Sequence, residues 1–367
     1  MKKRLLLVIL LILTLTGCNS KSKERVYDKH SYTFFNTFDT VVRTVMYVED
    51  EKKAEEYNNY IESRFNELHK EFNKYDKYEG INNVKTINEN AGIAPVKVSD
   101  DLFDLIKISL EYSKTYTDET DISLGSVLEV WSKYRDINED LDPSKVYESS
   151  ELLPSLEELE EANKYVGVEN IELDEKNKTV FIKNPNFRID VGATAKGYAV
   201  EIVGNELEKM GCDSLLISAG GNVKAIGQPL DGLRGRWGIG IMNPDVLYGT
   251  KDESNIVETI FVKDLSVVTS GDYQRYFIVD NKNYHHLIDR DTLQPGEYFR
   301  GVTVVHEDSG LADFLSTAVF LMPYEEGLDL IESIEGAECY WIFLDDSVKY
   351  TDGMKKMMLS EGATGAK

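Results

Sequence analysis

Residues 189–207 read IDVGATAKGYAVEIVGNEL: an apolar strand end, a turn of small residues, and then a helix. A strand that leads directly into a helix predicts a fold that combines the two. The small residues Gly192 and Ala193 let the backbone approach a ligand closely, and the free N–H groups at a helix start can bind phosphate. The stretch matches neither G-x-x-x-x-G-K-S/T nor G-x-G-x-x-G. By itself, such a turn more often serves packing than phosphate binding.

Strand patterns surround this stretch from about residue 170 onward. Short apolar runs separated by Gly, Asn and Asp turns are typical of strands. The runs are IELD, KTVFIK, SLLIS, WGIGIM, ETIFV, LSVVTS, YFIVD, RGVTVV and CYWIFL. Two helices are predicted among them, one after DVGATAKGY and one after GLADFLSTA. This order predicts an α+β (mixed α/β) fold in a single integrated unit without internal repeats.

Helical patterns dominate the chain before residue 170. Apolar residues recur every three or four positions over 54–75, which is typical of a long amphipathic helix. A second helix is predicted over 102–112. Ser155 followed by Glu158 resembles a capping box, which predicts a helix that runs to about Tyr165. The acidic residues of that last helix are most simply a solvated face.

The first residues of the chain have the layout of a secretory signal, with MKKR before the apolar run LLLVILLILTL. That run is shorter than the roughly 20 residues a membrane span needs. The following LTGC resembles a lipobox, which predicts a signal peptide over 1–17 and a diacylglycerol and palmitate anchor on Cys18. The alternative is an uncleaved N-terminal anchor. We therefore expect a lipoprotein on the extracytoplasmic face of the cell membrane.

The remainder divides by composition. Residues 18–31 are polar and without periodicity, and we expect them to form a tether from the membrane. The folded unit is predicted over 32–355 and a flexible tail over 356–367. Cys212 and Cys339 lie in apolar surroundings and are expected to be small buried side chains, although one disulfide between them stays possible.

Charge excludes one class of function and constrains another. The formal net charge is −24, and nucleic-acid binding instead requires clustered Lys and Arg. If this chain handles a phosphorylated ligand, a divalent cation is the usual means of offsetting the repulsion. Asp313 and Thr317 lie four positions apart on one face of a predicted helix, and both offer oxygen ligands suited to Mg²⁺. On spacing alone, the more ordinary interpretation is that Asp313 caps the helix or faces solvent and Thr317 bonds back to a helix carbonyl, because D-x-x-x-T is common.

A series of separated motifs, taken in order, closely resembles the ApbE family of FAD:protein FMN transferases over about residues 32–350. The motifs are TDxTDISLGxVLxVW, DVGATAKGYA, SxGGNV, SGDYxRYF, YHHLIDRDT and ADxLSTAVFxM. The resemblance implies one catalytic unit with a strand-rich body and smaller helical lobes, which binds FAD with Mg²⁺. It implies that FMN passes to a threonine hydroxyl of an exported flavoprotein as a phosphoester, and that AMP is released.

The resemblance also nominates residues. It implies Mg²⁺ ligands at the Ala193 carbonyl and at the side chains of Asp313 and Thr317. The second histidine of the YHHLID motif is the recurrent one in the family, which nominates His286 rather than His285 as the catalytic base. The family's Met-Gly-Thr triplet is matched to Phe35-Asn36-Thr37. FAD contacts are implied at Tyr75, Glu119, Thr120, Asp121, Asp190, Lys196, Asp272 and the backbone of Ile288.

Two other functions use the same residues. With water as acceptor, the site would act as a Mg²⁺-dependent FAD pyrophosphatase that gives FMN and AMP. Without catalysis, the chain would be a flavin-binding lipoprotein. The tail also contains Gly362-Ala363-Thr364, which resembles the G-A-T core that these transferases modify, but Met357 replaces the aspartate expected upstream.

Overall fold

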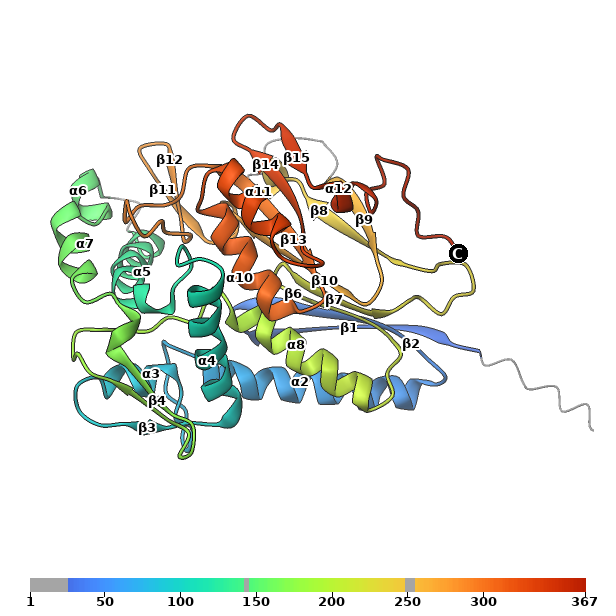
Figure 1. Ribbon diagram of the computed structural model, residues 1–367, viewed down its shortest axis with the longest axis horizontal. Helices are drawn as coiled ribbons and strands as arrows, with labels where there is room; N and C mark the ends of the chain where they lie inside the picture. Colours follow the sequence, from blue (N-terminus) through green and yellow to red (C-terminus); the bar gives the residue numbers. More distant parts are fainter. Residues whose placement is uncertain (1–25, 142–144, 248–254) are drawn as a thin grey trace, which may run out of the picture.

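A computed structural model of the chain describes residues 26–141, 145–247 and 255–367. Its centre is an eight-stranded sheet in the order β1-β2-β6-β7-β10-β13-β14-β15, and every neighbouring pair is antiparallel (Figure 1). The strands are β1 (Asp28–Thr37), β2 (Thr40–Val48), β6 (Ser214–Ala219), β7 (Asn222–Gly227), β10 (Leu265–Gly271), β13 (Phe299–His306), β14 (Glu338–Phe343) and β15 (Val348–Tyr350).

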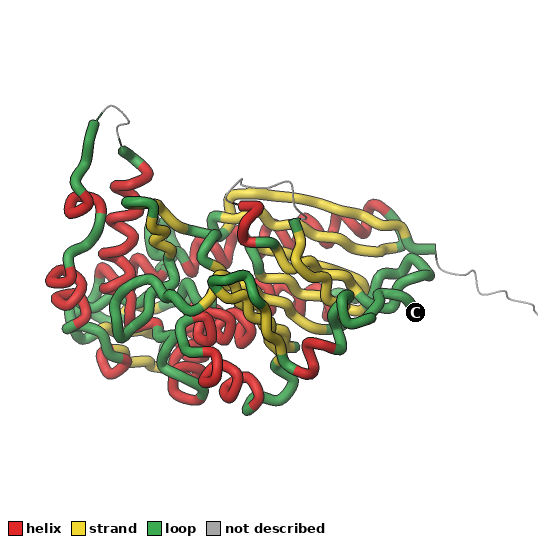
Figure 2. Tube along the Cα trace, turned by 90° about the horizontal axis from the view of Figure 1, so that it is seen from above, coloured by secondary structure: helices red, strands yellow, loops and turns green. Residues whose placement is uncertain are grey.

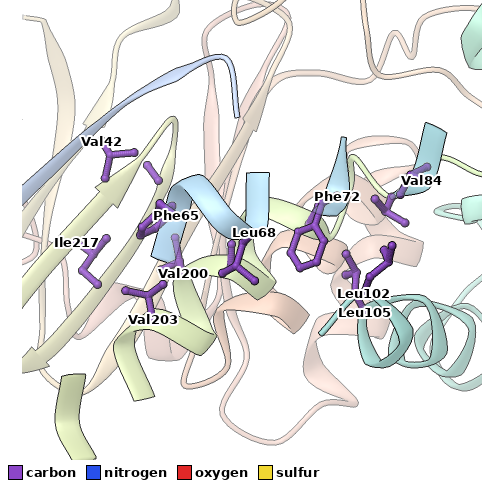
Figure 3. Packing of buried hydrophobic residues seen from close by; sticks show 14 of the residues in the cluster. Val42, Phe65, Leu68, Phe72, Val84, Leu102, Leu105, Val200, Val203 and Ile217 are labelled. Carbon is purple, nitrogen blue, oxygen red and sulfur yellow. The ribbon is translucent and has the colours of Figure 1, made fainter. Parts of the chain in front are cut away.

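Three helices cover one face of this sheet. They are α2 (Glu51–Phe72), α8 (Ala195–Lys209) and α10 (Ser309–Phe320). Phe65 and Leu68 of α2 meet Val200 and Val203 of α8 in a common core that includes Ile217 of β6 (Figure 3). Full burial of one such side chain contributes about 1.5–3 kcal/mol, so this layer fixes where the helices lie against the sheet.

The opposite face of the sheet packs against the hairpin of β8 (Trp237–Met242) and β9 (Ile256–Val262). The chain end joins this layer through α12 (Asp352–Lys355) and the residues that follow it. Phe261 donates its backbone N–H to Met357 at 2.8 Å, and Gly235 donates to Gly365 at 2.8 Å. The prediction of a flexible tail over 356–367 is therefore not met, because this segment is bonded along the hairpin.

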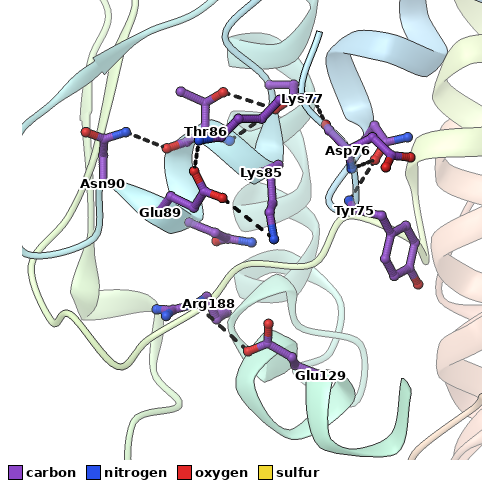
Figure 4. A network of polar contacts seen from close by, with 12 residues as sticks. Tyr75, Asp76, Lys77, Lys85, Thr86, Glu89, Asn90, Glu129 and Arg188 are labelled. Carbon is purple, nitrogen blue, oxygen red and sulfur yellow. Dashed lines mark hydrogen bonds and ion pairs between the residues drawn. The ribbon is translucent and has the colours of Figure 1, made fainter. Parts of the chain in front are cut away.

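Two smaller lobes lie at the other end of the molecule (Figures 1 and 2). One contains α3 (Val84–Glu89), α4 (Asp100–Thr115) and the sheet of β3 (Val96–Lys97), β5 (Thr179–Ile182) and β4 (Ile171–Asp174). In the polar network of Figure 4, Lys85 faces Glu89 within this lobe, whereas Arg188 faces Glu129 of the other lobe. The other contains η1 (Ile122–Leu124), α5 (Gly125–Glu139), α6 (Ser149–Leu152), α7 (Leu156–Asn163), η2 (Val168–Asn170) and the hairpin of β11 (Tyr276–Val279) and β12 (Lys282–His285).

The expected α+β fold is confirmed, and each predicted strand and helix is present within a few residues. The tether is shorter than expected, because β1 begins at Asp28 and pairs with β2 from there. As the sheet's terminal strand, β1 tolerates polar residues that conceal its strand pattern. Neither α11 (Tyr324–Glu332) nor the short α9 (Pro244–Leu247) was predicted. Cys212 and Cys339 are both buried and free.

The predicted signal peptide over 1–17 and the lipid anchor at Cys18 lie outside the described residues. Within the described ranges, none of the helices combines the length and apolar character needed to cross a membrane.

Candidate active site

A cavity of about 480 Å³ opens where the helical lobes meet the strand-rich body. This volume falls within the range of about 300–1,000 Å³ that is usual for small-molecule sites. The end of α2, the first turn of α8, the end of β10, the β11–β12 hairpin and α10 all contribute to its wall. Nearly all of the predicted site residues line it: Tyr75, Glu119, Thr120, Asp121, Asp190, Ala193, Lys196, His286, Ile288, Asp313 and Thr317.

The close crossing of α8 and α10 forms the floor of the site. A Cβ atom at Gly197 would lie 2.2 Å from the Ser309 carbonyl oxygen and 2.5 Å from the Asp313 Cβ. Only glycine therefore permits this approach. The Gly197 N–H donates to Asp313 Oδ2 at 2.7 Å, and the Lys196 ammonium lies 4.0 Å from Oδ1. The A-K-G sequence thus holds one buried carboxylate at the start of α8.

Asp313 is buried on α10, and three hydroxyl groups meet between α10 and β10. Asp313 is 3% exposed, and burial raises the pKa of its carboxyl. Ser270 on β10 lies 2.8 Å from the Ser316 hydroxyl and 3.3 Å from the Thr317 hydroxyl. Burial makes ionisation of the Asp313 carboxyl unfavourable, and a cation in contact with it would stabilise the ionised form.

These donors fit Mg²⁺. Over the described ranges, no group of three or more His, Cys, Asp or Glu side chains is placed to hold a metal. The predicted set instead combines one carboxylate with the Thr317 hydroxyl and the Ala193 backbone. Mg²⁺ commonly binds through one or two carboxylates and completes its shell with water and substrate phosphates.

The adjacent histidines differ sharply in environment. The His285 ring bonds the Gly296 carbonyl at 2.9 Å through Nε2 and accepts the Leu287 N–H at 3.3 Å through Nδ1. Burial lowers the pKa of His285 to about 4. His286 also lines the cavity, but its buried Nδ1 has no hydrogen-bond partner in the described part of the chain. Its backbone N–H donates to the Arg275 carbonyl at 3.0 Å. His285 is thus a structural residue, whereas His286 keeps free bonding capacity.

The protonation state of His286 follows from its surroundings. Burial lowers the pKa of His286 well below the ordinary value, and the positive charges of Arg275 and Lys196 lower it further. The imidazole is therefore neutral near pH 7 and can accept a proton.

The segment 119–121 contributes a more acidic wall. Burial, followed by the charges of Asp289 and Asp291, raises the pKa of Glu119 to about 7. Thr120 is 7% exposed, and its hydroxyl has no hydrogen-bond partner within the described residues. Asp121 caps η1 by accepting the Ser123 N–H at 2.8 Å. The Thr120 hydroxyl thus keeps bonding capacity, while the Asp121 carboxylate is already engaged.

Comparison with known proteins places this site in a family. The model of the ApbE family matches residues 38–341. The chain belongs to the ApbE family. A relative named FAD:protein FMN transferase from Treponema pallidum (strain Nichols) is 30% identical over 275 residues, which cover 73% of this chain and 72% of the relative. Another of that name, from Haemophilus influenzae, is 27% identical over 263 residues, with 71% of each chain covered.

Solved ApbE structures share the fold. The ApbE protein of Thermotoga maritima has a TM-score of 0.74 at 27% identity, and the alignment covers 90% of this chain and 99% of that one. The flavinyl transferase ApbE of Pseudomonas stutzeri has a TM-score of 0.71 at 22% identity over 92% and 98% of the two chains. At that lower identity the likeness concerns the fold alone. The expected ApbE membership is confirmed.

The turn between β1 and β2 also reaches the cavity. The family match begins at Phe38, and Phe38, Asp39 and Thr40 line the cavity at the β1–β2 turn. Phe35 is 59% exposed and does not line it. The chain carries two similar triplets, F-N-T over 35–37 and F-D-T over 38–40, and the structure brings the second one to the cavity. The match of the family's Met-Gly-Thr to 35–37 stays a prediction.

Asp272 is the predicted ApbE site residue that the structure does not bring to the cavity. Its backbone N–H donates to the Arg300 carbonyl at 3.1 Å. Burial raises the pKa of its carboxyl to about 6, with the Arg300 charge opposing the rise. Asp272 thus lies beside Arg300 in the turn after β10, and the nearby Ser270 and Arg275 line the cavity instead.

Sequence reasoning also missed several cations at the cavity wall, namely Lys74, Arg135 and Arg275. Lys74 forms an ion pair with Asp190, and Arg275 donates to the Phe38 carbonyl at 3.3 Å. Lys74 directly precedes the nominated Tyr75, and Arg275 belongs to the quoted SGDYxRYF motif. The signal was therefore present, but no spacing rule distinguishes these residues from surface cations.

Proposed function

We propose that this chain is an FAD:protein FMN transferase that moves FMN from FAD to a threonine hydroxyl of an exported protein. The reaction forms a phosphoester, requires Mg²⁺ and releases AMP. Family membership and the names of the relatives support flavin transfer from FAD to proteins. The threonine acceptor, the metal and the leaving group go beyond those names, and the cavity chemistry supports them.

The observation that carries this function is the state of His286. The neutral His286 imidazole, whose buried Nδ1 has no hydrogen-bond partner among the described residues, lines a cavity that Lys196 and Arg275 also line. Such a ring can accept the proton of an incoming hydroxyl group. An anionic pyrophosphate bound beside it would raise the pKa of His286, since opposite charge favours the protonated form. Substrate binding would therefore strengthen the base at the moment it is needed.

The remaining residues bind and orient. Lys196 and Arg275 offset the phosphate charge inside a protein of net charge −24. Mg²⁺, held by the Asp313 carboxylate, the Thr317 hydroxyl and the Ala193 carbonyl, would neutralise charge on the pyrophosphate as the bond to AMP breaks. Tyr75 is 44% exposed at the cavity wall and offers a ring face for stacking on an aromatic part of FAD.

We place the enzyme on the extracytoplasmic face of the cell membrane, anchored through lipid on Cys18. The signal-like residues 1–17 and the lipobox support this location. Exported proteins that carry the acceptor threonine would then be its partners.

The test is incubation of the purified protein with FAD, MgCl₂ and a candidate exported acceptor, followed by mass spectrometry of both proteins. We expect FMN mass on an acceptor threonine and an equal amount of AMP. His286→Asn should lose transfer yet still bind FAD, while His30→Asn on β1, away from the cavity, serves as the matched control. FMN and AMP released without any modified protein would identify a pyrophosphatase instead. FAD binding with no AMP would leave only a flavin-binding protein.

A further inference from the structure

The ion pair between Lys74 and Asp190 links two segments that lie far apart in the sequence. Lys74 follows the end of α2, and Asp190 precedes α8. We propose that Lys74 is a positioning residue whose pairing with Asp190 fixes the turn 190–193 and thereby the placement of Ala193 in the cavity. The inference deepens the proposed function and rests on it for the identity of the ligands, FAD and Mg²⁺.

Both oxygens of Asp190 are engaged within the chain. Oδ1 accepts the Gly192 N–H at 2.7 Å, and Oδ2 pairs with the Lys74 ammonium. The Asp190 N–H in turn donates to the Ile122 carbonyl at 2.9 Å. Asp190 therefore has its strongest contacts with the turn itself, and its role is to hold the residues before Ala193 rather than to bind the ligand directly.

The pair is shielded from water, which makes it strong enough to matter. The side chains of Lys74 and Asp190 are 20% and 10% exposed. Burial opposes the charge on Lys74, but Asp190 and Tyr75 more than offset it, so the pKa of Lys74 lies above its ordinary value. Burial likewise opposes ionisation of Asp190, yet Lys74 and the Gly192 N–H hold the pKa of Asp190 below its ordinary value. Removal of one partner from such a pair leaves an uncompensated buried charge, which is strongly unfavourable.

Lys74 itself is held at a fixed point. The Asn73 side chain accepts the backbone N–H groups of Tyr75 at 2.6 Å and of Asp76 at 2.7 Å, which closes a turn around Lys74. The Lys74 ammonium lies 4.9 Å from the centre of the Tyr75 ring. One ammonium group therefore contacts both the aromatic residue at the cavity wall and the carboxylate that shapes the turn before α8.

The competing role for Lys74 is direct contact with a phosphate of the ligand. The two roles differ in a measurable way. A positioning residue changes the turn when no ligand is present and acts together with Asp190. A direct contact leaves the empty turn unchanged and acts independently of Asp190.

Hydrogen exchange of the ligand-free protein tests the first difference. We expect Lys74→Met to increase exchange of the backbone amides over 190–195 at least several-fold, and Lys74→Arg to restore protection. Lys77→Met is the matched control, because Lys77 lies on the same segment but its side chain is 62% exposed and pairs with Glu89 at the surface. Unchanged exchange over 190–195 in a folded Lys74→Met protein overturns the inference.

Titration with Mg²⁺ at saturating FAD tests the second difference, which is whether Lys74 acts together with Asp190. Loss of a residue that orients a metal ligand typically weakens metal affinity 10–100-fold. We expect that loss in both Lys74→Met and Asp190→Asn, with the double variant no weaker than the weaker single one. Effects that multiply in the double variant, or a Lys74→Met protein with normal Mg²⁺ affinity, count against the inference.

These measurements separate the two claims. If the wild-type protein transfers no FMN yet the turn loosens in Lys74→Met, the proposed function fails and the positioning role stands. If transfer occurs but amide exchange over 190–195 is unchanged in Lys74→Met, the inference fails and the proposed function stands. Should Lys74→Met not fold, Lys74→Gln and Asp190→Asn carry the same comparison.

Discussion

The backbone N–H of Gly197 on α8 donates a hydrogen bond of 2.7 Å to the carboxylate of Asp313 on α10. These residues come from two motifs that are more than a hundred positions apart in the sequence, and they meet because α8 and α10 cross without a side chain between them. The D-V-G-A-T-A-K-G sequence therefore both allows the two helices to pack closely and positions a carboxylate in the cavity. Its last glycine places the carboxylate that the metal would use.

Gly197→Ala should disable the site by separating the helices. The new Cβ would fall 2.2 Å from the Ser309 oxygen, a contact that backbone must move to relieve. Overpacking of this kind typically costs about 1–3 kcal/mol. We expect a lower melting temperature and a loss of Mg²⁺-dependent FAD binding. Gly235→Ala is the control, because its new Cβ would lie 3.6 Å from the nearest atoms, and it should change neither the melting temperature nor the binding. A Gly197→Ala protein with normal Mg²⁺-dependent FAD binding would contradict the packing role.

Much of this arrangement could be predicted from the chain alone, for identifiable reasons. Strands such as WGIGIM alternate buried and exposed residues, and this alternation predicts them. The start of β1 instead has the polar composition of a tether, because it lies on the sheet's last strand. The motif resemblance nominated Asp313, Thr317 and His286, and all three line one cavity in the structure. It nominated Asp272 as well, but Asp272 follows β10 in the turn before β11 and is absent from the cavity wall, because a motif does not say which of its residues face the ligand.

His285→Ala should damage stability rather than chemistry. The ring holds the Gly296 carbonyl and the Leu287 N–H, and it packs edge-on against Phe320 at 5.5 Å. Loss of these buried contacts should cost about 2–4 kcal/mol. Urea unfolding measures this cost, and FMN transfer per folded molecule should remain near the wild-type rate. A stable variant without activity would instead make His285 part of the catalytic machinery.

Glu119→Gln should change how stability depends on pH. The pKa of Glu119 is raised from 4.5 to about 7 in the folded protein, first by burial and then by Asp289 and Asp291. The folded state therefore binds more protons than the unfolded state between these values, and this carboxyl makes stability fall as pH rises through that window. The variant's melting temperature should exceed that of the wild type at pH 8 by more than at pH 5. Glu79→Gln, at an exposed position, is the control. An equal difference at both pH values argues against a shifted Glu119.

Asp313→Asn should remove the stabilisation that Mg²⁺ provides. A ligand present at 100 times its dissociation constant stabilises the folded state by about 2.7 kcal/mol. We expect the wild type to melt higher with FAD and Mg²⁺ than with FAD and EDTA, and the variant to show no difference. Asparagine can still accept the Gly197 N–H, so the metal-free variant should be at least as stable as the metal-free wild type. Thr317→Val should weaken the metal response and Thr317→Ser should retain it; an undiminished response in Asp313→Asn would place the metal elsewhere.

Deletion of residues 356–367 should destabilise the whole domain, although the composition of this segment predicts a dispensable tail. Met358 is 2% exposed and belongs to the core between the sheet and the β8–β9 hairpin. Leu359 donates its N–H to the Thr259 carbonyl at 2.8 Å, so the segment also completes the outer edge of β9. Met358→Ala should cost about 2–5 kcal/mol, and the full deletion more than that. Leu359→Ala, at a side chain that is 53% exposed, should cost little. Urea unfolding of the variants measures each cost, and a deletion as stable as the full chain would show that the hairpin layer needs no cover from the chain end.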